Sequence, residues 1–255
     1  RHPHHPGDAG PVVKLLACAS EVFPLVKTGG LADVAGALPG ALAGQGIAVT
    51  TMLPGYPRVL EAAAPQGVAL DLPGLFGGPA RLLHATHRGL ALLVLDAPHL
   101  FARPGGPYAG PDGRDWPDNP IRFAGFAAAA ARAAQELGFD AVHAHDWQAG
   151  LVPAYLATAG GGPRSLFTIH NLAFQGQFHA SLFPVLGLPP AFMATDGVEY
   201  HGGVGYLKAG LWFADRLSTV SPTYAAEITA PEGGMGLDGL LRGRAAVLEG
   251  IVNGL

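Results

Sequence analysis

Short apolar runs of strand length recur along the chain, and patterns with helical spacing separate most of them. Apolar runs of about four to eight residues, bounded by turn formers, are typical of buried strands. We expect strands at Val12–Ala19, Ile47–Leu53, Ala80–Thr86, Leu90–Leu95, Ala141–His145, Ser165–His170, Arg216–Val220 and Ala246–Val252. Strands that alternate with helices predict an α/β fold, a doubly wound sheet of mostly parallel strands.

Helical patterns and loops fill the intervals between these strands. The clearest helix runs from Ile121 to Leu137, because Asp118 or Asn119 can cap it and Gly138 can end it. Other helices are expected to begin near Leu31, near Trp147 and after Ser221. The strands on either side of Arg88 and Gly89 are expected to form a local hairpin. The segment from Pro98 to Asn119 is rich in Gly, Pro and Asp, which predicts a long surface loop of the kind that is often functional.

Polar residues follow three of the predicted strands at the point where each strand ends. The first strand leads to Glu21 and KTGG (27–30), another leads to HAHDW (143–147), and a third leads to TIHN (168–171). Ligands of such sheets bind beyond the carboxyl ends of the strands. We therefore expect these three clusters to converge on one site.

The KTGG segment has the composition of an anion-binding turn. Lys27 carries a positive charge, Gly29 and Gly30 allow a ligand to approach the backbone, and the following helix directs free N–H groups to the same place. These features suit a phosphate or diphosphate, although the spacing is neither that of a Walker A loop nor G-x-G-x-x-G. The alternative is a plain strand-to-helix turn.

The histidines allow two interpretations. His143 and His145 point to the same side of a strand, so with Asp146 and His170 they could form a metal cluster, or they could be packed structural side chains. His170 and Asn171 offer adjacent donors and acceptors at a strand end, which suits sugar hydroxyl groups. Tyr108 is an aromatic residue of the long loop, and aromatic rings pack on sugar rings.

Composition narrows the class of protein further. The chain has 255 residues, a net charge of −4 and only 13% charged residues without a basic stripe, which argues against nucleic acid as a partner. No apolar run approaches the ~20 residues that span a bilayer. The single cysteine, Cys18, excludes an internal disulfide and suits a reducing compartment. We expect a cytoplasmic protein with a disordered extension at residues 1–11 and one domain at residues 12–255.

Seven segments together resemble one known family, the bacterial glycogen synthases and plant starch synthases that use ADP-glucose. They occur in the order and with the spacing of that family, between Val12 and the last residue. The segments are SEVFPLVKTGGLADV (20–34), DAPHLFARPGGPY (96–108), HAHDWQAGLVPAYL (143–156), TIHNLAFQG (168–176), KAGLWFAD (208–215), TVSPTYAAEI (219–228) and GMGLDGLL (234–241). One departure is at Gly203 and Gly205, where relatives usually carry larger polar residues.

The resemblance implies the amino-terminal Rossmann-like half of a GT-B glycosyltransferase, whose main nucleotide-binding residues lie in the other half. It implies transfer of glucose from ADP-glucose to the non-reducing end of an α-1,4-glucan such as glycogen, with retention and without a cofactor or metal. The catalytic residues that it implies are His170, Asp146 and Lys27. The donor-binding residues are Lys27, Gly29, Gly30, Asp33 and Asn253, and the acceptor-binding residues are Glu21, Tyr108 and Asn171.

Two other functions remain open at this point. The chain could be an isolated glucan-binding domain or a catalytically incomplete fragment, because the family's second domain is absent from it. It could instead be a metal-dependent hydrolase built on His143, His145, Asp146 and His170.

Overall fold

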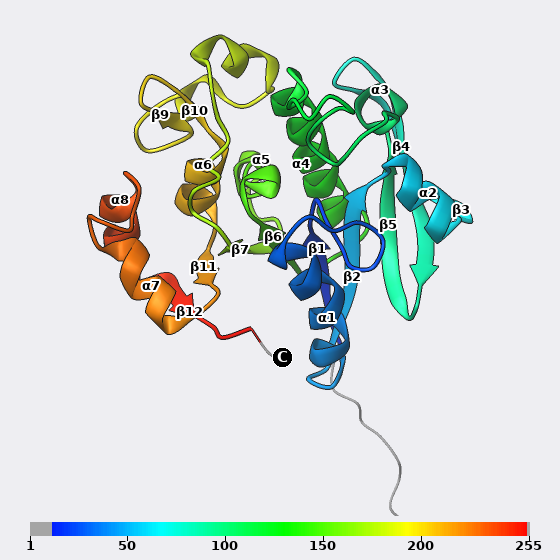
Figure 1. Ribbon diagram of the computed structural model, residues 1–255, viewed down its shortest axis with the longest axis horizontal. Helices are drawn as coiled ribbons and strands as arrows, with labels where there is room; N and C mark the ends of the chain where they lie inside the picture. Colours follow the sequence, from blue (N-terminus) through cyan, green and yellow to red (C-terminus); the bar gives the residue numbers. More distant parts are fainter. Residues whose placement is uncertain (1–11, 254–255) are drawn as a thin grey trace, which may run out of the picture.

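A nine-stranded sheet forms the centre of the molecule, in the order β12-β11-β7-β6-β1-β2-β5-β4-β3 (Figure 1). The computed structural model describes residues 12–253, so the extension predicted at residues 1–11 lies outside the described residues. Neighbouring strands from β12 to β5 pair in parallel, and β4 pairs antiparallel with both β5 and β3. The prediction of a doubly wound, mostly parallel sheet is confirmed.

All eight predicted strands are present in this sheet, with ends that differ from the expected ones by a few residues. The strands of the sheet are β1 (Val13–Cys18), β2 (Ile47–Pro54), β3 (Gly67–Leu75), β4 (Gly78–His87), β5 (Leu90–Asp96), β6 (Ala141–His145), β7 (Arg164–Ile169), β11 (Arg216–Thr219) and β12 (Leu248–Gly250). The predicted hairpin is also confirmed, because Arg88 and Gly89 both adopt positive φ angles, of 46° and 82°, between β4 and β5.

Helices cover both faces of the sheet. The helices α4, α5 and α6 pack against one another on one face, while α1 packs along β2 on the other (Figure 1). The helices are α1 (Gly30–Ala43), α2 (Pro57–Ala63), α3 (Pro98–Phe101), α4 (Asn119–Glu136), α5 (Val152–Ala159), α6 (Tyr206–Phe213), α7 (Pro222–Thr229) and α8 (Asp238–Gly243). Within the described part of the chain, no helix is both long enough and apolar enough to cross a membrane.

The helix ends show where local chemistry was predicted well and where it was not. Ser221 caps α7 as expected, because its Oγ accepts a hydrogen bond of 2.9 Å from the Tyr224 amide. The expected side-chain cap of α4 is wrong: Asp118 stands at the cap position, but its side chain makes no cap bond and binds Arg103 instead. A tertiary ion pair has therefore replaced the local cap.

Two further parts of the fold differ from the sequence-based expectation. The strand β3 was not predicted, because Pro73 and Gly74 interrupt its apolar pattern. It pairs with β4 through two register shifts, between Val68 and Leu70 and between Leu72 and Leu75. A small second sheet, built from β8 (Gln177–Phe178), β9 (Glu199–Tyr200) and β10 (Gly203–Gly205), was also missed, since its strands are only two or three residues long.

The loop expected at 98–119 is only partly a surface loop. It begins with α3, whose Leu100 and Phe101 are buried, and a short antiparallel bridge joins Ala109 to Asp115. The segment is therefore folded onto the body of the domain, next to the carboxyl ends of the parallel strands.

Candidate functional site

The carboxyl ends of β1, β6 and β7 meet at one cavity of about 500 Å³. The strand order reverses at β1: the chain continues from β1 to β2 on one side and returns to β6 on the other. The connections that leave β1 and β6 therefore diverge, and such a point is where doubly wound sheets bind their ligands. The three polar clusters that the sequence placed at strand ends converge here, as predicted.

Eight of the ten predicted site residues line this cavity. They come from the segment after β1, the long loop, the ends of β6 and β7, and the described end of the chain. They are Glu21, Gly29, Gly30, Tyr108, Asp146, His170, Asn171 and Asn253. Lys27 and Asp33 are not among the lining residues: they form an ion pair of 2.7 Å with each other, and both side chains are about half exposed.

Glu21 connects the glycine turn (residues 27–30) to the long loop (residues 98–119). Its side chain is buried, and its Oε1 accepts hydrogen bonds from the amides of Thr28, at 2.5 Å, and Gly29, at 3.2 Å. Its Oε2 accepts from the Thr28 hydroxyl, at 2.7 Å, and from the Tyr108 hydroxyl. One carboxylate therefore fixes two walls of the cavity.

The glycine turn keeps other N–H groups for a ligand. Glu21 already occupies the amides of Thr28 and Gly29. The amides of Gly30 and Leu31 lie in the first turn of α1, where a helix leaves N–H groups without intrahelical partners, and both residues line the cavity. An anion at this point would also be stabilised by the α1 dipole.

Asp146 has a strained backbone at the end of β6. Its φ of 57° and ψ of −175° lie in a region that is almost restricted to glycine. Two hydrogen bonds hold this conformation: the Asp146 amide donates to the Thr168 carbonyl, at 3.0 Å, and Oδ1 accepts from the His170 amide, at 2.7 Å. Strain of this kind is typical of functional positions. The two hydrogen bonds that hold it connect the end of β6 to the end of β7.

Burial raises the pKa of Asp146 to about 7, although the amides of His170 and Asn171 oppose this shift, and the nearby Glu21 adds to it. We expect the free energy of unfolding to fall as the pH rises from about 4 to about 7. The reason is that the folded protein retains a proton on Asp146 that the unfolded chain has already lost. Urea denaturation between pH 5 and pH 8 measures this.

The variant Asp146→Asn should lack this pH-dependent part, and Asp71→Asn, at an exposed position of β3, is the matched control. The difference in stability between wild type and Asp146→Asn should therefore change with pH. A difference that stays constant across the whole range would contradict a raised pKa at Asp146.

Three histidine rings lie together at β6 and the end of β7, and His170 is the one of them that lines the cavity. The rings of His143 and His145 lie 4.0 Å apart, and His145 Nδ1 shares a hydrogen bond of 2.8 Å with His170 Nε2. Burial lowers the pKa of His143 to about 3 and that of His170 to about 4, and it also lowers the pKa of His145. The three rings are therefore neutral at pH 7, so His170 acts as a hydrogen-bonding group and not as a cation.

The structure does not place His143, His145, Asp146 and His170 as a set of metal ligands. Among residues 12–253, no three His, Cys, Asp or Glu side chains are placed so as to hold a metal ion. His143 Nε2 instead binds the Thr168 hydroxyl at 2.6 Å, and that hydroxyl binds Ser218 Oγ at 2.6 Å.

Sequence reasoning missed several residues of the cavity wall. Asn119 was considered only as a helix cap, Thr28 only as part of KTGG and Gln148 only as part of segment 143–156, while Trp147 was noted as an aromatic residue of HAHDW without a role; no pattern pointed to Asp115. Proximity to HAHDW was the one available signal for Gln148. Asn119 and Asp115 come from the folded part of the long loop, whose path the sequence does not reveal.

A larger hollow of about 810 Å³ lies elsewhere, between β9, α6 and α8. The lysine and the arginine that line it already donate hydrogen bonds to backbone carbonyls. Lys208 donates to Thr195 and Gly197, and Arg244 donates to Leu211 and Ala214. The smaller cavity gathers the strand-end polar groups and the strained Asp146, so we assign the functional site to it.

The fold and this cavity define a class of protein, the amino-terminal Rossmann-like half of a GT-B glycosyltransferase. More particularly, the chain belongs to the starch synthase catalytic domain family, whose model matches residues 14–243. It is 61% identical, over 251 residues, to a glycogen synthase of Rhodopseudomonas palustris strain BisA53, covering 95% of this chain and 51% of the relative. A glycogen synthase of Methylocella silvestris is 57% identical, with the same coverage.

A solved structure is similar over nearly the whole chain. The catalytic domain of starch synthase IV from Arabidopsis thaliana, bound to ADP and acarbose, superposes with a TM-score of 0.83 at 28% identity. The match covers 96% of this chain and 52% of that one. The chain thus spans about half the length of the relatives it matches.

Proposed function

We propose that this chain, from residue 12 to residue 255, is the amino-terminal catalytic domain of a glycogen or starch synthase. In this proposal the whole enzyme transfers glucose from ADP-glucose to the non-reducing 4-hydroxyl of an α-1,4-glucan, with retention. The observation that carries the proposal is the cavity itself, where a glycine turn, a neutral histidine and a tyrosine from the long loop face one another. Membership of the family supports it, as does the neighbour bound to ADP and acarbose.

On the donor side, we assign the diphosphate of ADP-glucose to the start of α1. The amides of Gly30 and Leu31 are suitably placed, and Gly29 leaves the approach open because a Cβ there would meet nothing within 4 Å. Lys27 precedes the lining residue Thr28, is paired with Asp33, and would exchange this exposed partner for the more highly charged diphosphate. Asn253, which lines the cavity, completes the donor side.

The chemistry follows from where charge develops. Breaking the bond between glucose and phosphate makes the sugar ring more positive and the diphosphate more negative, so donors fixed at the leaving group lower the barrier. Lys27 and the first turn of α1 supply such donors. Retention fits attack on the same face as departure, where the leaving phosphate oxygen accepts the proton of the acceptor hydroxyl.

The roles of His170 and Asp146 follow from their chemistry. A neutral His170 can donate or accept a hydrogen bond to a glucose hydroxyl beside the reacting carbon, and Asp146 holds the amide of His170 in place. On the acceptor side, we assign Tyr108, Asn171 and Glu21 to the glucan, with Glu21 acting mainly through Tyr108 and the glycine turn. A buried free Cys18 is compatible with the reducing cytoplasm, where we place the enzyme.

The decisive experiment measures incorporation of labelled glucose from ADP-glucose into glycogen. The complete gene product that carries this chain should incorporate label. Unlabelled ADP-glucose should reduce this incorporation more than the same concentration of unlabelled UDP-glucose. Binding to glycogen without any incorporation, in the complete gene product, would favour the alternative of a glucan-binding domain. Metal analysis of the purified protein tests the hydrolase alternative: a stoichiometric transition metal would count against the proposal.

Lys27→Ala is expected to weaken the use of ADP-glucose by about 1.5–3 kcal/mol, the loss of one charge-assisted contact. This corresponds to about a 10- to 150-fold fall in kcat/KM for ADP-glucose. The control is Lys14→Ala, which removes an exposed lysine of β1. Equal kcat/KM values for Lys27→Ala and the control would remove Lys27 from the donor site.

A further inference from the structure

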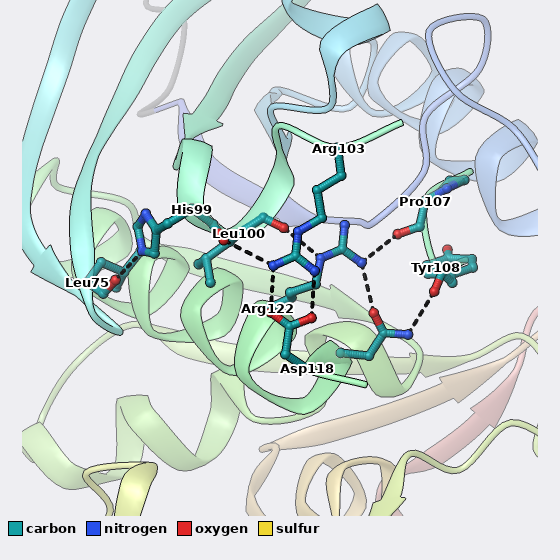
Figure 2. A network of polar contacts seen from close by, with 9 residues as sticks. Leu75, His99, Leu100, Arg103, Pro107, Tyr108, Asp118 and Arg122 are labelled. Atoms are coloured by element: carbon teal, nitrogen blue, oxygen red, sulfur yellow. Dashed lines mark hydrogen bonds and ion pairs between the residues drawn. The ribbon is translucent and has the colours of Figure 1, made fainter. Parts of the chain in front are cut away.

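Arg122 is a fully buried arginine whose hydrogen bonds all reach the long loop or its boundary (Figure 2). It lies in the first turns of α4 and is 1% exposed. Its Nε donates to the Leu100 carbonyl at 2.6 Å, and its Nη1 donates to the Pro107 carbonyl at 3.0 Å and to Asn119 Oδ1 at 2.8 Å. One guanidinium thus ties the beginning of the loop to the residue just before Tyr108.

The surroundings of Arg122 make this arrangement costly to build. The guanidinium lies over the rings of Phe101, at 5.1 Å, and Phe123, at 5.5 Å. All three of its acceptors are uncharged, and within the described residues no carboxylate lies at ion-pair distance from it. Burying a charge without a counter-charge is unfavourable unless its donors are well satisfied. A merely apolar side chain would fill this space without that cost, so the loop contacts are what the arginine contributes.

The contacts continue from Arg122 to the cavity. Because Asn119 Oδ1 accepts from Arg122, the amide of Asn119 is oriented so that Nδ2 donates to the Tyr108 carbonyl at 2.9 Å (Figure 2). The Tyr108 hydroxyl then meets Ser20 Oγ, at 2.8 Å, and Glu21. The path from Arg122 therefore fixes the backbone position of Tyr108, and Ser20 and Glu21 fix the direction of its ring.

An ion pair supports another part of the same loop. Arg103 and Asp118 form a bidentate pair, at 2.6 and 2.5 Å, and the Arg103 guanidinium lies 5.0 Å from the Trp116 ring. This pair is partly exposed, whereas Arg122 is buried at the inner end beside Tyr108. The two arginines hold different parts of the loop: Arg103 binds Asp118, whereas Arg122 binds the lining residue Asn119 and the carbonyl of Pro107, next to Tyr108.

We propose that Arg122 is a positioning residue for the glucan side of the cavity, which it serves through Pro107, Asn119 and Tyr108. This inference rests on the proposed function. Arg122 is not among the residues that line the cavity, so it acts on a glucan only through the lining residues Asn119 and Tyr108. It is distinct from the donor side, because Lys27 and the start of α1 are held by Asp33 and Glu21.

The first test uses hydrogen exchange without any substrate. Arg122→Met keeps an unbranched apolar stem but removes the guanidinium and its three hydrogen bonds. Exchange in residues 104–117 should become at least tenfold faster than in wild type, while exchange in β6 and β7 should not change. The matched control is Arg132→Met on the same helix, an exposed arginine paired with Glu136, which should leave the loop unaffected.

The second test separates the two substrates of the complete gene product. In Arg122→Met, the KM for a maltooligosaccharide acceptor should rise about tenfold, and the KM for ADP-glucose should change less than twofold. Arg122→Lys, which retains the charge but not the fork of donors, should fall between wild type and Arg122→Met. Equal increases in both KM values, or loop exchange that matches Arg132→Met, would overturn the proposal.

If Arg122→Met does not fold, Asn119→Ala decides the question, since it removes the bonds of Asn119 to the Tyr108 carbonyl and to Arg122 Nη1 but leaves the bonds of Arg122 to Leu100 and Pro107. Faster exchange at 104–117 in Asn119→Ala would support the proposal, and unchanged exchange would contradict it. The exchange result does not depend on transfer. A wild-type protein that transfers no glucose would therefore refute the proposed function separately.

Discussion

Replacing Glu21 with alanine is expected to lower the free energy of unfolding by about 2–3 kcal/mol and to reduce glucosyl transfer at least 100-fold. The carboxylate accepts four hydrogen bonds, from two amides and two hydroxyls, and alanine leaves these donors without a protein partner. The glycine turn and Tyr108 lose their shared anchor at once. A 100-fold change in rate corresponds to about 2.7 kcal/mol of barrier, which is the scale expected from misplacing groups at the reacting bond.

Urea denaturation and the incorporation assay measure the two effects. Glu61→Ala, at an exposed position of α2, is the control for loss of a carboxylate. Glu21→Gln retains the shape and one acceptor, so it should lose less of both stability and activity than Glu21→Ala. If Glu21→Ala retained wild-type transfer, glucosyl transfer would not depend on the connection that Glu21 makes between the two walls of the cavity.

Gly150→Ala is expected to destabilise the protein by about 3 kcal/mol, although it adds a single methyl group. A Cβ at this position would lie 2.1 Å from the Tyr206 carbonyl oxygen and 2.6 Å from its carbon, and backbone atoms cannot move aside as a flexible side chain can. The φ of −63° at Gly150 is open to any residue, so the close approach of α6 is the reason for the glycine. Chemical denaturation measures the loss.

The matched control is Gly40→Ala on α1, where an added Cβ would meet nothing within 4 Å. Alanine favours a helix over glycine by about 1 kcal/mol, so this variant should be neutral or more stable. The same change therefore has opposite expected signs at two positions. Equal stabilities for the two variants would show that α6 can shift away from residue 150.

The sequence was most informative where one strand is buried on both faces. Ala141–His145 was predicted with the bounds that the structure shows, because a short segment with Ala141, Val142 and Ala144 ends there in Asp146. The strand β3 was missed because it lies at the edge of the sheet, where Pro73 and Gly74 are tolerated and the apolar pattern is broken. Local pattern therefore predicts central strands better than edge strands.

The site was predictable to the extent that it follows from strand ends. Parallel strands bring their carboxyl ends to one edge, which is why Asp146, His170 and Glu21 were expected together. The assignment of partners was not predictable in the same way. That Asp118 binds Arg103 rather than its own helix, and that Glu21 binds Tyr108, depends on contacts between residues 15 and 87 positions apart.

The two margins of the main sheet also bear on how the protein behaves when it is crowded. At one margin, β3 carries Pro73, which has no N–H to offer, and two register shifts bend its hydrogen-bonding row. At the other margin, β12 is only three residues long. Neither margin offers a long, flat template for a strand from another molecule, so fibril-like stacking through the sheet is disfavoured even at high concentration.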